Sequence, residues 1–369
     1  MSALYFHIPF CKRICSYCDF PKCADLRLMP ATIEAMHREM DNTRDFLHDT
    51  TVGTIYFGGG TPSLLPPCEL QRFIDHAADI YDLSQVEEIT AEVNPDDIDR
   101  KYVSALRTTD IGRISVGIQS FDDDALKLMN RRHTAKQAEE AVKSLQDAGY
   151  GNITVDIIFG IEGFGDDCLR RNLEHVLALG IQHVSAYHLT IEPSTRFGRM
   201  AARGDIHAVD EERSEREFRI IHDTLTDSGF EHYEVSNYAL GGYRSRHNSS
   251  YWLGTEYLGI GAGAHSFNGN SRRWCEQSAD KYVRGCEYVS ERLDERDRRN
   301  ETVMTSLRRI EGIDLADFAE KFGAEYAERL AEEAVKLKGY GVECDGNSIR
   351  IPPERMLVSD AVIESLFDV

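Results

Sequence analysis

Several things that the sequence lacks narrow what this protein can be. Among its 369 residues, Lys and Arg number 42 against 63 Asp and Glu, which gives a formal net charge of −21. Binding to nucleic acid needs clustered Lys and Arg, so this deficit argues against it, and against binding to anionic lipid by charge alone. No run reaches the ~18 apolar residues of a spanning helix, and no basic segment followed by an apolar core opens the chain. We therefore expect a cytoplasmic protein that does not bind nucleic acid.

A disulfide framework is also missing from the sequence. The chain has nine cysteines, an odd number, and six of them are scattered without regular spacing. Such usage is typical of a reducing, cytosolic environment and predicts free thiols. The six scattered residues are Cys23, Cys68, Cys168, Cys275, Cys286 and Cys344.

The other three cysteines form the most informative stretch of the chain. Cys11, Cys15 and Cys18 stand in a CxxxCxxC array directly after a short run that is typical of a strand, and three thiols this close indicate a metal site. An iron-sulfur cluster ordinarily takes four cysteine ligands, so a cluster held by these three leaves one iron open to a small molecule. The alternative is a structural zinc completed by His7 or Cys23, although no second CxxC half is present.

The pattern of apolar residues predicts the architecture. With 41% hydrophobic residues, the chain can bury a substantial core, and we expect a barrel-type domain with a smaller appendage. Up to about residue 191, six β-rich runs alternate with helical patterns, which predicts a parallel sheet with right-handed crossovers. Six units are too few to close an eight-stranded barrel, and a doubly wound sheet fits the pattern equally well. The predicted strands are Leu4–Ile8, Thr54–Phe57, Glu88–Val93, Arg113–Ile118, Thr154–Phe159 and His183–Leu189, and the predicted helices include Ala31–Leu47, Cys68–Tyr81, Thr134–Ala148 and Leu169–Leu179.

Two candidate ligand-binding groups follow the second and third strands, at the edge where ligands collect in both kinds of sheet. Gly59, Gly60 and Thr61 come directly after the second strand. Consecutive glycines let a backbone approach a ligand closely, although a tight turn explains them as well. Glu92 lies at the end of the third strand, where its carboxylate would accept from ribose hydroxyls or pair with a Lys or Arg.

Three further polar residues belong to the fourth and fifth strands or follow them. Gln119 lies at the end of the fourth strand, and Arg131 follows in the next helical stretch. Asp156 lies within the fifth strand, among residues that should be buried. A buried aspartate needs hydrogen bonds or a cation, which we expect Arg131 or a bound ligand to supply.

The region from Tyr233 to Phe267 concentrates aromatic residues, glycines and two histidines. Its GIGAGA run lacks the context of a dinucleotide-binding loop and instead indicates close approach of the backbone to a cofactor or substrate. In the HNSSYW segment, His247 is a candidate axial ligand for heme iron, with Tyr251 and Trp252 packing on the porphyrin. The alternative is a histidine hydrogen-bonded in a turn, and His265 is a competing ligand.

The last seventy residues change in composition. Three helical patterns and a hairpin-like pair of strands predict a winged-helix-like module, and the acidic surroundings argue against DNA as its ligand. We divide the chain into a barrel domain over 1–230, a connecting segment over 231–299 and the C-terminal domain over 300–369.

The segments HIPFCxxxCxYCDF, GGGTP, AEVNP and HNSSYW resemble the radical SAM superfamily, in the branch of HemN/HemW proteins, which are similar to oxygen-independent coproporphyrinogen III oxidase. The resemblance implies an α/β fold, an incomplete parallel (β/α)6 barrel with a C-terminal helical, winged-helix-like domain. It implies a 4Fe-4S cluster on Cys11, Cys15 and Cys18, with S-adenosyl-L-methionine on the open iron. The residues implied to line the S-adenosylmethionine pocket are Tyr5, Gly59, Gly60, Thr61, Glu92, Gln119, Arg131 and Asp156. One departure is Gly160-Ile161-Glu162-Gly163 where relatives read GLPG.

Two functions are compatible with this resemblance, and they leave open whether the protein is an enzyme. HNSSYW resembles the HNxxYW motif of the heme chaperones, which implies heme on His247 and transient contact with respiratory membrane proteins, as a monomer or homodimer. The alternative is a coproporphyrinogen III dehydrogenase that forms protoporphyrinogen IX by radical oxidative decarboxylation in porphyrin biosynthesis. Relatives with that activity carry a further cysteine where this chain has Phe20, and a segment before the strand, whereas this chain starts four residues before Tyr5. We therefore favour the chaperone; a zinc-stabilised α/β enzyme of another kind is the third reading.

Overall fold

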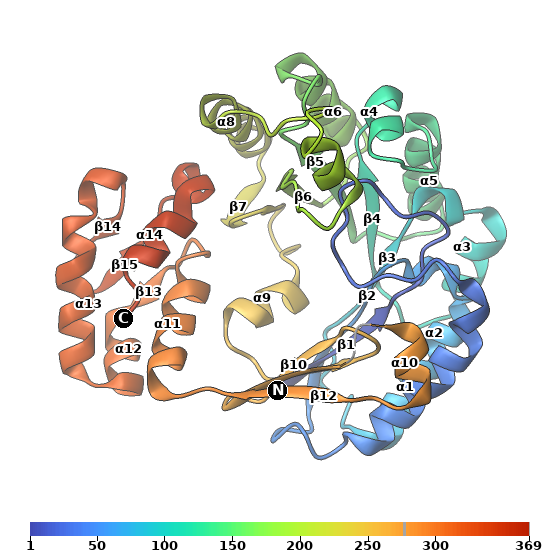
Figure 1. Cartoon of the computed structure of the whole chain (residues 1–369), viewed down its shortest axis with the longest axis horizontal. Helices are drawn as coiled ribbons and strands as arrows, with labels where there is room; N and C mark the ends of the chain where they lie inside the picture. The colour runs from blue at the N-terminus through green and yellow to red at the C-terminus, as the bar shows by residue number, and fades with distance from the viewer. Residues whose placement is uncertain (276–277, 369) are drawn as a thin grey trace.

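A single twelve-stranded sheet is the centre of the computed structural model, which describes residues 1–275 and 278–368 (Figure 1). Its first six strands are parallel neighbours in chain order. The outermost strands of the sheet, β12 (Tyr288–Arg292) and β7 (Glu231–Glu234), remain edges. A doubly wound sheet reverses its strand order at a switch point, so this order confirms the incomplete (β/α)6 barrel. The six strands are β1 (Ser2–Ile8), β2 (Val52–Gly59), β3 (Glu88–Val93), β4 (Arg113–Gln119), β5 (Ile153–Phe159) and β6 (His183–His188).

Helices cover the outer face of these strands (Figure 1). In α5, Thr134 and Gln137 form a capping box, and Ala138, Val142 and Leu145 are buried at spacings of four and three, which places one apolar stripe on the sheet. The helices between the first six strands are α1 (Met29–Asn42), α2 (Pro67–Ile80), α3 (Arg100–Leu106), α4 (Asp123–Leu128), α5 (Ala135–Asp147) and α6 (Asp166–Ala178), followed by α7 (Arg196–Ala201) and α8 (Glu211–Asp227). The six strands and four helices predicted above are confirmed, with shifted ends.

The segment expected to be a connection contributes to both edges of the same sheet. Two short strands extend it beside β6, and β9 pairs in parallel with β1, followed by three antiparallel strands. The elements are β7 (Glu231–Glu234), β8 (Asn237–Ala239), α9 (Arg246–Trp252), β9 (Tyr257–Ile260), β10 (His265–Phe267), β11 (Ser271–Cys275), α10 (Ala279–Arg284) and β12 (Tyr288–Arg292). The barrel sheet therefore continues well past residue 230.

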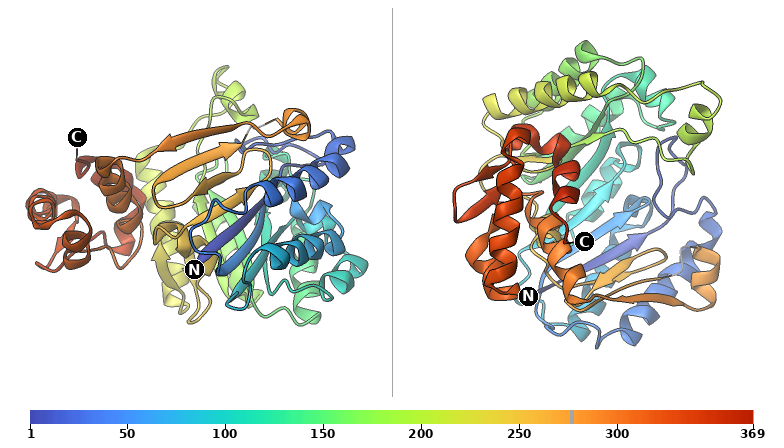
Figure 2. Two further views of the ribbon diagram at one scale, coloured as in Figure 1. Left: turned by 90° about the horizontal axis from the view of Figure 1, so that it is seen from below. Right: turned by 60° about the vertical axis from the view of Figure 1, so that its left-hand side comes forward.

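The C-terminal module has its own apolar core and projects to one side of the barrel (Figure 2). Backbone hydrogen bonds join it to β7 and to the residue that follows this strand: Ile310 N donates to Tyr233 O at 3.2 Å and Val235 N donates to Arg308 O at 3.0 Å. Its three-stranded sheet in the order β13-β15-β14 agrees with a winged-helix-like arrangement. The elements are α11 (Glu295–Ser306), β13 (Ile313–Asp314), α12 (Leu315–Phe322), α13 (Ala324–Lys336), β14 (Glu343–Cys344), β15 (Ser348–Arg350) and α14 (Ser359–Ser365).

The expectation that the scattered cysteines are all free is wrong for one pair. Cys275, at the end of β11, forms a disulfide with Cys286, and their Cα atoms are 6.1 Å apart. The antiparallel pairing of β11 with β12 brings them together, because Cys275 pairs in register with Tyr288. A single local hairpin needs no framework of regularly spaced cysteines. Among the helices of the described residues, none has the length and apolar character to span a membrane.

Candidate functional site

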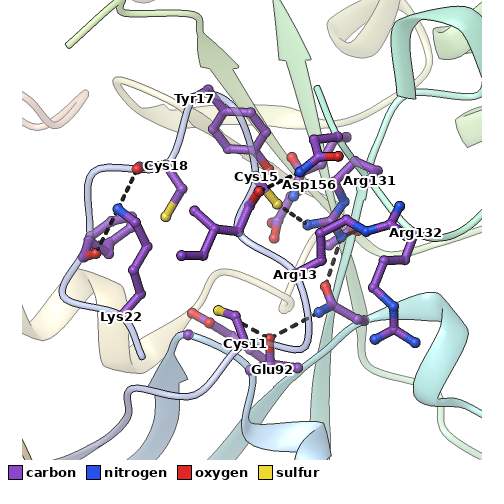
Figure 3. Close-up of a pocket in the computed structure, with 18 of the residues that line it drawn as sticks. Cys11, Arg13, Cys15, Tyr17, Cys18, Lys22, Glu92, Arg131, Arg132 and Asp156 are labelled. Carbon is purple, nitrogen blue, oxygen red and sulfur yellow. Dashed lines mark hydrogen bonds between the residues drawn. The ribbon is translucent and has the colours of Figure 1, made fainter. Parts of the chain in front are cut away.

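The three array cysteines lie in the irregular segment after β1 and face one cavity. Figure 3 shows the sulfur atoms of Cys11, Cys15 and Cys18 turned toward it. The cavity measures about 380 Å³ and opens at the carboxyl ends of β2 to β6, within the range of small-molecule sites. The structure therefore brings the three thiols together where a parallel sheet binds its ligands.

The spacing of the three sulfurs distinguishes between an iron-sulfur cluster and a structural zinc site. They do not all lie within 4.8 Å of one another, whereas Zn–S bonds of 2.3 Å in a tetrahedron would hold them about 3.8 Å apart. His7, one of the two candidates for a fourth zinc ligand, has Nδ1 3.0 Å from the Tyr5 hydroxyl and Nε2 3.0 Å from the carbonyl of Pro21. The donor set fits a larger group that binds each sulfur at a different atom, as an iron-sulfur cluster does.

Two neighbours place donors on these sulfurs. Nη1 of Arg131 donates to Sγ of Cys15 at 3.4 Å, and Oγ1 of Thr61 donates to Sγ of Cys11 at 3.7 Å. Burial raises the pKa of the Cys11 thiol to about 11, and burial also raises the pKa of Cys18. Thiolates at such positions need a cation beside them, which a bound metal cluster provides.

Arg131 is held by a chain of polar contacts that the sequence did not reveal. Its Nη2 donates to Oδ1 of Asn94 at 2.7 Å and to the carbonyl of Gly117, and Nδ2 of Asn94 donates to Oγ1 of Thr61 at 3.1 Å. Asn94 also lines the cavity. Asn94 belongs to the AEVNP segment, whose sequence alone did not indicate a contact with Arg131.

The glycines after β2 have a packing role as well as a place in the cavity wall. Gly60 N donates to Ile8 O at 2.8 Å, and a Cβ on Gly60 would lie 2.8 to 2.9 Å from backbone atoms of Ile8, Pro9 and Phe10. The end of β1 can approach the end of β2 this closely only because residue 60 has no side chain. Gly59, Gly60 and Thr61 all line the cavity, so the run lies where a ligand bound in the cavity would meet it.

Two acidic side chains share the floor of the cavity. Oε1 of Glu92 accepts from the Tyr56 hydroxyl at 2.8 Å, and Oδ1 of Asp156 accepts from Oγ of Ser115 at 3.4 Å. Burial, followed by the negative charge of Asp156, raises the pKa of Glu92 to about 7, and burial raises the pKa of Asp156 to about 6. The expected partner of Asp156, Arg131, donates elsewhere. Perturbed carboxyl groups in a cleft indicate a functional site.

Gln119 has a backbone conformation that its residue type rarely adopts. Its φ is 69°, in the left-handed region that costs a non-glycine residue of the order of 1 kcal/mol. It ends β4 and lines the cavity with Glu92, Arg131 and Asp156. Such strain concentrates at ligand sites, and in this chain it turns the strand end at the cavity rim.

Seven of the eight residues predicted for the S-adenosylmethionine pocket line this cavity, and Tyr5 does not. Tyr5 is directed to His7 Nδ1. The cavity also contains Tyr187, which sequence reasoning missed; Tyr187 lies near the end of β6, is 42% exposed and lines a second cavity as well. The only feature of the sequence that indicates a role for Tyr187 is its position near the end of a strand.

The HNSSYW segment forms α9, and its histidine is enclosed. His247 is 1% exposed; its Nδ1 lies 2.8 Å from Oγ1 of Thr54 and its Nε2 lies 3.0 Å from the hydroxyl of Tyr251. Burial lowers the pKa of His247 to about 3, so the imidazole is neutral. Tyr251 and Trp252, unlike His247, line the second cavity, of about 1190 Å³, between α9 and the C-terminal module.

Other residues singled out in the sequence have local partners. Glu162 accepts from His207 N at 2.7 Å, and the competing histidine, His265, stacks on Trp274. In the GIGAGA run, a Cβ on Gly261 would lie 2.4 Å from the carbonyl of His7. The absence of a side chain at Gly261 therefore lets this run approach the backbone of β1, just before the cysteine segment. We had expected it to approach a cofactor or substrate instead.

Two models of known protein families match this chain, one in its N-terminal half and one near its C-terminus. A model of the Radical SAM superfamily matches residues 5–176, and a model of the HemN C-terminal domain matches residues 293–358. The first match spans the three array cysteines and the cavity residues as far as Asp156. The second covers most of the C-terminal module.

Several relatives that match most of the chain carry the same name. The sequence is 33% identical over 341 residues to "Heme chaperone HemW" of Lactococcus lactis subsp. lactis (strain IL1403), which covers 91% of this chain and 89% of the relative. It is 31% identical over 332 residues to "Heme chaperone HemW" of Bacillus subtilis (strain 168), with coverage of 88% and 87%. Among solved structures, coproporphyrinogen III oxidase (HemN) from Escherichia coli has a TM-score of 0.83 at 20% identity, covering 99% of this chain and 89% of that one, which establishes the shared fold.

Proposed function

The chain belongs to the HemW family of radical SAM proteins, and on that premise we propose that it is a heme chaperone with a 4Fe-4S cluster and an S-adenosylmethionine site. It would hold heme in the cytoplasm and deliver it to respiratory membrane proteins. The observation that carries the cluster and cofactor part is the single cavity onto which the three cysteines and seven predicted cofactor residues converge.

Cys11, Cys15 and Cys18 would hold three irons of the cluster, and the fourth iron would face the same cavity. Bound there, the cluster would supply an electron for reductive cleavage of S-adenosylmethionine. Arg131, which donates to Sγ of Cys15, would offset part of the negative charge of the thiolates. The wide spacing of the sulfurs supports this assignment over zinc.

The remaining cavity residues are suited to the other end of the cofactor. Gly59, Gly60 and Thr61 would meet its amino-acid end through backbone groups and a hydroxyl. Glu92 would accept from the ribose hydroxyls, for which a carboxylate with two oxygens is suited. Gln119, Arg131 and Asp156 complete the wall in this proposal.

Two features of the sequence favour the chaperone over the dehydrogenase. Position 20 holds Phe20, which is 67% exposed, where the dehydrogenases carry a further cysteine. The HNxxYW motif is present and lies at the second cavity, which Tyr251 and Trp252 line and which is large enough for a porphyrin-sized ligand. His247 remains our proposed heme ligand; to reach iron, its Nε2 has to exchange the Tyr251 hydroxyl for the metal.

One experiment separates the two functions. Anaerobically reconstituted protein is given S-adenosylmethionine, a reductant and coproporphyrinogen III, and 5′-deoxyadenosine and protoporphyrinogen IX are both followed; a parallel sample is titrated with hemin. We expect hemin binding and no protoporphyrinogen at catalytic turnover. Protoporphyrinogen formed over many turnovers would establish the dehydrogenase instead, and failure to bind hemin would remove the chaperone.

A further inference from the structure

A buried cluster of reactive groups lies where α1 packs beside α10 (Figure 1), away from the cavity of the array cysteines. A carboxylate oxygen of Glu39 and the sulfurs of Cys275 and Cys286 all lie within 4.8 Å of one another, and the two cysteines are joined as a disulfide. None of these residues lines the cavities assigned above to cofactor and heme. A carboxyl group this close to a disulfide is placed for proton transfer to sulfur.

Glu39 is held in position by donors from three elements. Its Oε2 accepts from the Tyr282 hydroxyl at 2.6 Å and from Gly261 N at 2.7 Å, and its Oε1 accepts from the Tyr288 hydroxyl at 2.7 Å. The side chain is 4% exposed. The charged group facing it from β11 is Arg273, whose guanidinium lies over the Tyr288 ring, 4.4 Å from its centre. Burial raises the pKa of Glu39, although the three donors and the charge of Arg273 oppose that rise.

The two sulfurs differ in access. Cys275 is 1% exposed, whereas Cys286 is only partly buried. Sγ of Cys286 lies 3.7 Å from Oε1 of Glu39. A reductant from solvent would therefore meet Cys286 first, with the enclosed Cys275 as the leaving group. A thiolate that leaves into an apolar enclosure requires a proton.

We propose that Cys275 and Cys286 are a redox-active pair that exchanges electrons with a small dithiol, and that Glu39 is its proton donor. A thiolate of the reductant attacks Sγ of Cys286, the bond between Cys286 and Cys275 breaks, and Cys275 takes a proton from the Glu39 carboxyl. The second thiol of the reductant then releases Cys286 as a thiol and leaves as a disulfide. Two electrons and two protons pass to the protein, and Glu39 recovers its proton from solvent. This assignment does not depend on heme or cofactor binding.

The test uses the full chain, loaded with its cluster and kept anaerobic after purification. Dithiothreitol is added, samples are alkylated at intervals, and mass spectrometry measures the alkylated fraction of Cys275 and Cys286. We expect both to be protected before reduction and to become reactive together. In Glu39→Gln the rate at neutral pH should fall about 100-fold, the scale of lost general acid catalysis. The thiolate-corrected rate is the reduction rate divided by the fraction of dithiothreitol that is present as thiolate. In the native protein this rate should fall as pH rises and Glu39 loses its proton. In Glu39→Gln it should not change with pH.

Glu34→Gln is the matched control, because Glu34 lies on the same helix, is exposed and pairs with Arg72; it should keep the native rate. Alkylation of both cysteines before any reductant is added would overturn the proposal. So would equal rates and equal pH profiles for the native protein and Glu39→Gln. If Glu39→Gln does not fold, the pH dependence of the thiolate-corrected rate in the native protein tests the proposal instead. A rate that does not change with pH would show that Glu39 is not the proton donor.

Discussion

Nε2 of His247 lies 3.0 Å from the hydroxyl of Tyr251, and the two rings are nearly perpendicular at 87°. Nε2 is the nitrogen that would bind heme iron, and it is in hydrogen-bond contact with this hydroxyl. The other ring nitrogen, Nδ1, is in contact with Oγ1 of Thr54. Both ring nitrogens of the proposed heme ligand therefore have protein partners, and replacement of Tyr251 by Phe would free Nε2 without removal of the imidazole.

The first prediction follows from that contact. If His247 ligates heme, Tyr251→Phe should bind hemin at least as tightly as the native protein, because Nε2 no longer has a hydroxyl to lose. His247→Ala should bind at least about tenfold more weakly, a difference of about 1.4 kcal/mol. Hemin titrations followed by absorbance measure both variants, with the iron-sulfur absorbance as the check on folding. Equal affinities in His247→Ala and the native protein would remove His247 from the heme site.

The pH range of this binding is a second prediction. Burial lowers the pKa of His247 to about 3, so the imidazole is neutral throughout pH 5 to 8. An exposed histidine would lose affinity through competition with protons near its ordinary pKa of about 6.5. We expect hemin affinity to show no step near pH 6.5. A step there would indicate an exposed ligand, and His265 is then the first residue to replace.

Arg131 gives a prediction about the cluster. If the cluster is bound as proposed, the contact of Arg131 with Sγ of Cys15 would stabilise the extra negative charge of the reduced cluster, so Arg131→Met should lower its midpoint potential. A hydrogen bond to a charged group contributes about 1.5 kcal/mol or more, which corresponds to roughly 60 mV for one electron. Potentiometric titration followed by electron paramagnetic resonance measures the shift. Arg132→Met is the control, because Arg132 pairs with Asp96 instead; an equal shift in both variants would mean that general charge is responsible.

Glu92 provides a prediction in which stability and binding change in opposite directions. Its folded pKa is raised to about 7 from 4.5, so the folded state binds the proton more tightly than the unfolded state, and the carboxyl destabilises the fold increasingly as pH rises from 4.5 to 7. Glu92→Gln removes this cost. At pH 8 its free energy of unfolding, measured without cofactor by urea titration, should equal or exceed that of the native protein.

The same substitution should weaken S-adenosylmethionine binding by about 10- to 100-fold, because hydrogen bonds to a charged acceptor contribute about 1.5–3 kcal/mol. Isothermal titration calorimetry measures this. Glu88→Gln, at the opposite end of β3, is the control: Glu88 accepts from Arg246 N and His247 N at 3.0 Å each. That variant should lose stability and keep its cofactor affinity. Unchanged affinity in Glu92→Gln would contradict the ribose assignment.

The sequence predicted those parts of the molecule that depend on local pattern. The six barrel strands are short runs rich in β-branched and aromatic residues, and residues such as Glu92 and Gln119 could be placed because they stand at strand ends, where a parallel sheet gathers its ligands. Strand β9 could not be found in this way, since its partner β1 lies about 250 residues away in the chain and its four residues give little periodicity. Tyr187 and Asn94 were missed for a related reason, because their neighbours come from other strands.

The enclosure of His247 depends on contacts that no motif records. The HNSSYW segment identifies the histidine, but its burial results from the position of α9, whose first amide groups donate to Glu88 on β3. The disulfide between Cys275 and Cys286 likewise depends on the register of two short antiparallel strands. Motif and periodicity therefore predict which residues matter, and long-range packing decides which of them face a cavity.

The last prediction concerns the glycine run below the cysteine segment. Gly261 has φ of 118°, and a Cβ there would lie 2.4 Å from the carbonyl of His7. Because the obstacle is backbone on β1, neither side can move without disturbing the strand that leads to the cysteines. Gly261→Ala should lower the free energy of unfolding by about 2 kcal/mol or more, and it should also reduce the iron content after reconstitution.

Gly151→Ala is the control, since a Cβ there meets no atom within 4 Å, and it should change stability by less than about 0.5 kcal/mol. Urea titration and iron analysis measure the two effects. If Gly261→Ala loses stability but keeps full iron loading, then the close packing supports the fold alone and the cysteine segment does not depend on it.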